Sequence, residues 1–318
     1  MHLVETMAYA GEKPWHGLGN KLTTLQPIEV WKRQAGMDWM IEESEVRYIT
    51  GNHTVGAIHS FPEQKVLYRS DTKRPLAVVS KRFQVVQPEE VLEFYRDLTE
   101  HAGFELETAG VLKEGRKFWA LARTGQSTTL KGKDQVNGYL LLATACDGSL
   151  ATTAQFTSVR VVCNNTLQIA LGDNRGAVKV PHRSEFNPDA VKQQLGITVA
   201  PWNRFVSKMK GLVACQVDPD SVDGLLRRML TYPGQPGQAP VVNEQAMRSV
   251  RALYDGGGRG AQLASSRGTA WGLLNSVTEY VDHHRRARSD DHRREAAWFG
   301  QGAQFKQRAW DELVQLTA

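Results

Sequence analysis

The chain contains 318 residues, of which 41% are hydrophobic and 23% are charged, and its formal net charge is +5 at neutral pH. This is the composition of a globular protein with a sizeable core, and the length suggests two subdomains or one domain with a large appendage. No apolar stretch approaches the roughly 18 residues of a membrane span, the first residues lack the apolar core of a signal peptide, and the three cysteines, Cys146, Cys163 and Cys215, fit neither a disulfide framework nor a zinc site. We therefore expect a cytoplasmic protein without a membrane partner.

The first hundred residues alternate between helix and strand patterns. A short helix is expected at residues 27–37, with Pro27 near its start. It is followed by predicted strands at residues 39–50, 54–61 and 65–69 and by an extended apolar segment at residues 76–86. Residues 88–101 predict an amphipathic helix, because their apolar side chains recur at helical spacing.

Two hairpins are predicted next. Residues 104–113 and 117–123 form the first, around Glu114-Gly115. Residues 139–145 and the polar strand that begins near Thr152 form the second, because Asp147-Gly148 accepts the positive φ that a tight turn needs. Residues 160–167 then predict a junction between this strand and a helix with a polar tip.

After Pro188 the pattern becomes helical. Helices are expected at residues 189–213, 221–230, 244–254, 269–288 and 293–316, with Gly- or Pro-rich linkers at residues 232–240 and 255–268. The predicted fold class is therefore α+β. An antiparallel hairpin sheet packed with helices, a β-β-β-α-like core, occupies residues 1–187, and an all-helical C-terminal domain occupies residues 188–318.

Positive charge is concentrated in two segments. Residues 104–183 carry ten Lys and Arg against six Asp and Glu, and residues 267–308 carry eight against five. Clustered cations favour a polyanionic partner, although a solvated surface explains a small excess equally well. Cations that contact phosphate and aromatic rings that stack on bases would together hold single-stranded nucleic acid. The residues that fit these roles are Lys81, Arg82, Phe83, Arg116, Lys117, Trp119, Arg123, Lys131, Lys133, Arg160 and Asn164.

Within that set, Phe83 and Trp119 are the stacking candidates, and Arg160 with Asn164 could clamp a phosphate. Core packing is the competing interpretation for Trp119. Catalytic alternatives are weaker. Asp282-His283-His284 and Asp290-Asp291-His292 could supply metal ligands, but the arginines around them would repel a cation. The sequence predicts no catalytic set, no metal and no cofactor.

Four motifs carry a family resemblance. They are Pro14-Trp-His-Gly-Leu-Gly19, the segment 76–87, the run Thr157-Ser-Val-Arg-Val-Val-Cys-Asn-Asn-Thr-Leu167 after Asp147-Gly148, and the segment 268–283. In this order they resemble the phage/plasmid-like protein family, a domain of unknown function carried by prophages, phages and plasmids. That resemblance implies a mobile-element protein but no biochemical activity.

A second resemblance concerns topology. Two hairpins followed by a helix resemble the β-β-β-α core of single-strand annealing recombination proteins. This resemblance implies a ring or filament of identical subunits that holds single-stranded DNA in a basic groove without nucleotide or metal. The leading hypothesis is therefore non-catalytic single-stranded DNA binding and strand annealing by a homo-oligomer. The alternatives are a protein-binding regulator or inhibitor of a host defence or replication protein, and a metal-dependent nuclease.

Overall fold

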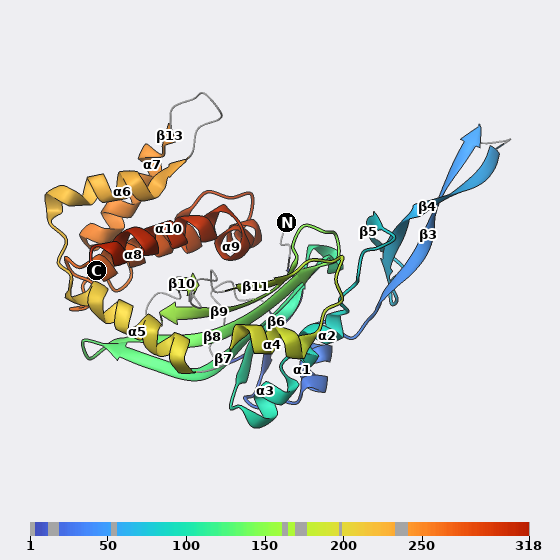
Figure 1. The fold of residues 1–318 in the computed structure, drawn as a ribbon, viewed down its shortest axis with the longest axis horizontal. Coiled ribbons are helices and arrows are strands. Elements are labelled where there is room, and N and C mark those ends of the chain that lie inside the picture. The colour runs from blue at the N-terminus through green and yellow to red at the C-terminus, as the bar shows by residue number, and fades with distance from the viewer. Residues whose placement is uncertain are drawn as a thin grey trace.

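The computed structural model describes residues 4–11, 19–51, 56–160, 165–168, 177–196, 199–232 and 241–317. It contains a large curved sheet, helices on both sides of that sheet, and a long β-ribbon that extends away from the body (Figure 1). The predicted α+β class, with a mostly antiparallel sheet and a helical C-terminal part, is confirmed.

The main sheet has eight strands in the order β10-β9-β8-β7-β6-β1-β2, with β11 paired to β9 as well. Its pairs are antiparallel except β1 with β2. The strands are β1 (Val4–Ala10), β2 (Asn20–Leu22), β6 (Glu105–Leu112), β7 (Lys117–Leu130), β8 (Asp134–Ala145), β9 (Thr152–Arg160), β10 (Asn165–Gln168) and β11 (Ala177–Val180).

Both predicted hairpins are present in this sheet. The first turns at η1 (Lys113–Gly115), and the second turns at residues 146–150, where Gly148 has a φ of +74°. The helix predicted after the second hairpin is wrong, because Asn165–Gln168 form β10 and pair with β9 in the register Asn165↔Arg160. The open edge of β9 offers backbone hydrogen-bond partners that a local sequence pattern does not reveal.

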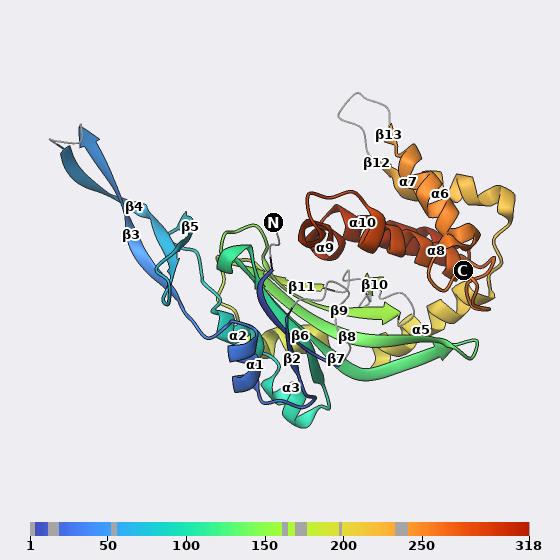
Figure 2. The ribbon, with the colours of Figure 1, turned by 180° about the vertical axis from the view of Figure 1, so that it is seen from behind.

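The two faces of the sheet are covered by different parts of the chain. Even-numbered residues of β7 and β8, such as Phe118 and Leu140, belong to the large core under the N-terminal helices. Tyr95 is fully buried there, and its hydroxyl lies 2.8 Å from the carbonyl oxygen of Ala120. The helices on this side are α1 (Ile28–Gln34), α2 (Pro88–Glu93), α3 (Arg96–His101), α4 (Pro188–Leu195) and α5 (Val199–Ala214) (Figures 1 and 2).

Odd-numbered residues face the C-terminal helices, since side chains alternate along a strand. Trp119, Tyr139 and Leu141 form a second apolar cluster against which Trp298 and Phe299 pack. The C-terminal elements are η2 (Pro219–Ser221), α6 (Val222–Leu230), β12 (Thr231–Tyr232), β13 (Val241–Val242), α7 (Glu244–Ala252), η3 (Leu253–Gly257), α8 (Ala270–Glu279), η4 (Tyr280–His284), α9 (Asp290–Phe299) and α10 (Gln301–Gln315). Within the described residues, no helix is both long enough and apolar enough to cross a membrane.

A buried carboxylate joins the sheet to the C-terminal helices. Asp134, at the start of β8, is 1% exposed, and its Oδ2 accepts hydrogen bonds from Ser265 Oγ at 2.6 Å and from Trp271 Nε1 at 3.0 Å. All three residues are buried. This contact joins positions more than 130 residues apart and anchors the first turn of α8 against the sheet.

A separate three-stranded antiparallel sheet consists of β3 (Ile41–Gly51), β4 (Gly56–Arg69) and β5 (Pro75–Ser80). The strand is continuous through Pro62, at the bulge where the β3–β4 register shifts, so the predicted break between residues 61 and 65 is absent. Strand β5 pairs only with the inner part of β4, at residues 64–68. The outer part of β3 and β4, residues 46–51 and 56–61, is therefore a two-stranded ribbon, which we call the arm (Figure 2).

Candidate nucleic-acid interface

The loop after β5 is fixed against a distant part of the chain. Phe83 stacks on His182, with 4.3 Å between ring centroids and 18° between the ring planes. His182 Nε2 lies 2.9 Å from the carbonyl oxygen of Leu150, in the turn between β8 and β9. Residues 81–84 thus lie beside residues 181–184 and the turn at 146–150.

The turn between β6 and β7 reaches the same end of the main sheet. The carbonyl of Arg116 accepts a hydrogen bond of 2.9 Å from the amide of Cys146, directly before Asp147-Gly148. The exposed cations on these neighbouring loops and turns are Lys81, Arg82, Arg116 and Arg183. We call these four residues, together with the Phe83–His182 pair, the basic rim.

The cations of the basic rim are available to a ligand. All four are exposed, and none forms an ion pair with a residue that the structure describes. Some other arginines in the described part are engaged, as Arg96 is by Glu93 and Glu29 at 2.6 Å each. Acidic residues on the same turns, Glu114 and Asp147, reduce the net positive potential of the rim but do not pair with its cations. Four uncommitted cations at one end of a sheet form a site that favours phosphate.

Two of the predicted cations lie at the opposite end of the main sheet. Lys131 and Lys133 are exposed in the turn between β7 and β8. Strand β7 has 14 residues, which at about 3.3 Å per residue separate this turn from Arg116 by up to about 45 Å along the strand. The backbone of Arg160 pairs with Val136 near the same end. The Arg160 side chain and the whole of Asn164 lie outside the described residues.

Three other predicted residues are occupied by contacts within the protein. Lys117 and Trp119 do share a face of the strand, as predicted, but each is only 4% exposed. Trp119 packs so closely over Gly110 that a Cβ on that glycine would lie 2.4 Å from the indole. Its ring therefore has no free face for a base, and core packing is the correct interpretation. Arg123 donates to Glu107 at 2.6 Å, which compensates its charge.

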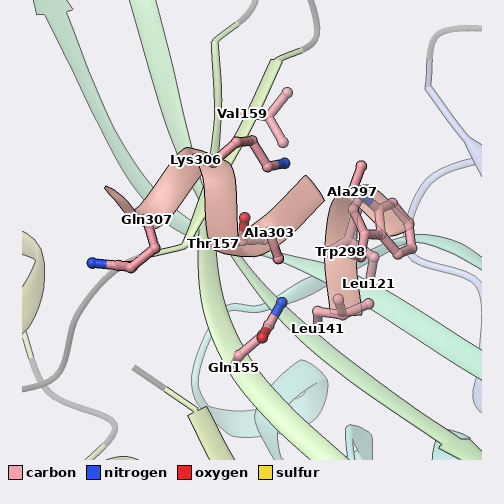
Figure 3. Close-up of a pocket in the computed structure, with 10 residues that line it drawn as sticks. All are labelled: Leu121, Leu141, Gln155, Thr157, Val159, Ala297, Trp298, Ala303, Lys306 and Gln307. Carbon is pink, nitrogen blue, oxygen red and sulfur yellow. The ribbon is translucent and has the colours of Figure 1, made fainter. Parts of the chain in front are cut away.

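The face of the sheet that carries Trp119 is covered by α9 and α10. Between the sheet and these two helices is a crevice of about 20 Å³, which has room for about one water molecule (Figure 3). Its walls come from Leu121, Leu141, Gln155, Thr157 and Val159 of the sheet and from Ala297, Trp298, Ala303, Lys306 and Gln307 of the two helices. Among the described residues, the crevice between this face and the two helices is too small for a polymer.

The histidine- and aspartate-rich segments of the C-terminal part are spread over several local contacts. Asp282 forms a buried ion pair of 2.8 Å with Lys306. His284 Nε2 lies 3.6 Å from Glu279, and His292 bonds to Ser289. In the part of the chain that the structure describes, no three His, Cys, Asp or Glu side chains are grouped as metal ligands.

The fold and the rim together define an α+β protein with a basic end to its main sheet. The chain belongs to the family described as a domain of unknown function (DUF932), whose model matches residues 75–298. The matched segment begins at β5 and ends within α9, so it contains all four cations of the basic rim. No curated protein matches the chain, and no solved structure matches it.

Proposed function

We propose that the protein binds single-stranded DNA at the basic rim and anneals complementary strands during recombination of a phage or plasmid in the cytoplasm of its bacterial host. The observation that carries the proposal is the gathering of four unpaired cations beside a stacked aromatic pair. A single strand is flexible enough to bring successive phosphates to cations on different turns, and every base has a face that stacks on an aromatic ring.

Annealing requires no catalytic group in this scheme. Two complementary strands pair spontaneously once their mutual repulsion is reduced, and cations that neutralise phosphates reduce it. The rim of one subunit is small, so several subunits side by side would present a longer track of cations. A homo-oligomer is therefore part of the proposal, as a ring or a filament.

The experiment compares two matched double variants. K81A/R82A removes two cations from the rim, and K131A/K133A removes two exposed cations from the opposite end of the same sheet. Binding of a labelled oligonucleotide is measured by fluorescence anisotropy across a range of salt concentrations. We expect K81A/R82A to weaken binding and to reduce the slope of log K against log salt by about 1.4, because each phosphate contact on a single strand contributes about 0.7.

The control variant K131A/K133A should leave both the affinity and the slope unchanged. Equal losses of affinity in the two variants would show that binding is a general effect of net charge and would refute the basic rim as the binding site. Undetectable binding of the unmodified protein at low salt would refute the proposed function itself. Strand annealing is scored separately, by the rate at which two complementary labelled strands form duplex.

A protein-binding regulator or inhibitor of a host defence or replication protein is the second candidate, and the arm is the observation that favours it. Its strands expose large apolar side chains, with Ile49 70% and Ile58 66% exposed as a cross-strand pair. Arg47 of the arm is paired with Glu45 at 3.0 Å, so the arm offers phosphate no uncompensated arginine or lysine among its described residues. Sedimentation of I49K/I58K and of the unmodified protein distinguishes the two possible partners of the arm. Loss of self-association in the variant assigns the arm to a second copy of the chain, whereas unchanged self-association leaves the arm available to another protein.

A further inference from the structure

The glycine-rich segment after α7 borders an open cavity of about 270 Å³, far from the basic rim in sequence. Its walls come from residues 217–219, from α7 and η3, and from residues 261–268. Gly256 makes the fold of this wall possible, because its φ of +127° is strained for any other residue. A Cβ at Gly256 would also lie 2.7 Å from Nε2 of Gln262, so the bare backbone lets that amide reach the cavity.

Tyr254 contributes a hydroxyl without a partner. Among the residues that the structure describes, it is the only buried side-chain oxygen or nitrogen that lacks a hydrogen bond. A buried polar group is normally satisfied, since leaving it unpaired is unfavourable. Burial raises the pKa of Tyr254, so the phenol keeps its proton at neutral pH and can donate to a ligand. Tyr254 also lines the cavity.

The remaining polar groups of the cavity are mostly donors. Arg267 is exposed and forms no ion pair with any described residue. Arg251 is held in position by Asp255 at 2.9 Å and by Asp223 at 3.1 Å. The carboxylate that lines the cavity, Asp255, is thus already engaged. A wall of guanidinium, phenol and amide donors suits an anion with several acceptor oxygens.

Apolar residues complete the lining and indicate the rest of the ligand. Val217, Pro219 and Ala261 lie beside the donors. The volume is well above that of a bare phosphate and lies near the lower end of small-molecule sites. We propose that this cavity binds a small organic phosphate of about the size of a mononucleotide, with its phosphate on Arg267 and a hydroxyl or base edge on Tyr254. The site is separate from the DNA-binding rim and does not depend on it.

The test is isothermal titration of the full chain with AMP, ribose 5-phosphate and inorganic phosphate. We expect AMP to bind with a dissociation constant below about 1 mM and R267A to weaken it about tenfold. R259A is the matched control, because Arg259 is an exposed arginine of the same loop that does not line the cavity. R259A and K81A/R82A should both leave the affinity for AMP unchanged.

Y254F provides a readout that a purely structural tyrosine would not give. Without ligand, the variant should melt at the same temperature as the parent or higher, because it loses an unpaired hydroxyl. With AMP, it should bind about fivefold more weakly. Absence of saturable binding by all three probes at about 5 mM would overturn the proposal. Equal losses of AMP affinity in R259A and R267A would also overturn it, as would a Y254F variant that melts at a lower temperature and binds AMP normally. Oligonucleotide binding is measured on the same R267A protein and should be retained, so the two proposals fail independently.

Discussion

The buried pair Lys306–Asp282 allows a quantitative test of how α10 is attached to η4. The two groups are 2.8 Å apart, and their side chains are only 5% and 8% exposed. K306M replaces the ammonium with an apolar chain of similar length and removes one cationic partner of the buried Asp282 carboxylate. Removing one partner of such a pair destabilises a protein by about 3–5 kcal/mol. That is a large share of the roughly 5–15 kcal/mol by which a typical protein is stable.

Urea unfolding followed by circular dichroism gives the free energy of each variant. The control is R228M, which breaks an ion pair of 2.9 Å between Arg228 of α6 and Glu312 of α10, the helix that also carries Lys306. The side chains of this control pair are 55% and 34% exposed. Exposed pairs contribute at most about 1 kcal/mol. The double variant K306M/D282L should recover most of the loss, since it removes both charges. A K306M loss no larger than that of R228M, or a double variant as unstable as the sum of its parts, would refute the buried-pair explanation of Asp282.

Three further predictions concern other parts of the fold. Burial raises the pKa of Cys146 to about 12, so about one molecule in ten thousand carries the thiolate at pH 8 and iodoacetamide should label this cysteine only on unfolding, as mass spectrometry would show. The hydrogen bond from Arg69 lowers the pKa of Asp71 from 3.8 to about 2. The stabilisation that this ionised pair contributes is complete above pH 4 and is lost as the pH falls through 2, and it stays below about 1 kcal/mol because Asp71 is exposed. The acid unfolding curve of D71N should lack this contribution. Truncation of Leu67, which is fully buried, should destabilise the protein by about 2–5 kcal/mol, whereas I58A on the arm should change stability by less than about 0.5 kcal/mol in the same denaturation assay.

Short sequence patterns predict those elements whose conformation is set by the residues of the element itself. Asp147-Gly148 predicts a turn because the backbone there needs a positive φ, and the structure has one at Gly148. The stretch around Asn165 failed as a helix because its hydrogen-bond partners lie on β9 and are supplied by the tertiary fold. Residues 189–213, predicted as one helix, are interrupted after α4 by Gly196 in a left-handed conformation.

The candidate site shows the same division. Alternation correctly places Lys117 and Trp119 on one face, but only the packing of β1 and α9 decides that this face is buried. Phe83 was identified from its basic neighbours, whereas its partner His182 is nearly a hundred residues away and carries no local signal. The Tyr254 hydroxyl has none either, since an unpaired buried atom can be recognised only in three dimensions.

The arm has a consequence for the shape of the molecule in solution. The whole of β3, with 11 residues, spans about 36 Å at about 3.3 Å per residue, and the arm is the outer part of this strand, about 20 Å long. A compact chain of this length has a radius of gyration of about 20 Å. A ribbon that narrow adds little mass at a large distance from the centre (Figures 1 and 2). Small-angle scattering should therefore show a distance distribution with a single main peak and a long, low tail, and the tail alone should disappear when residues 46–61 are replaced by a short turn.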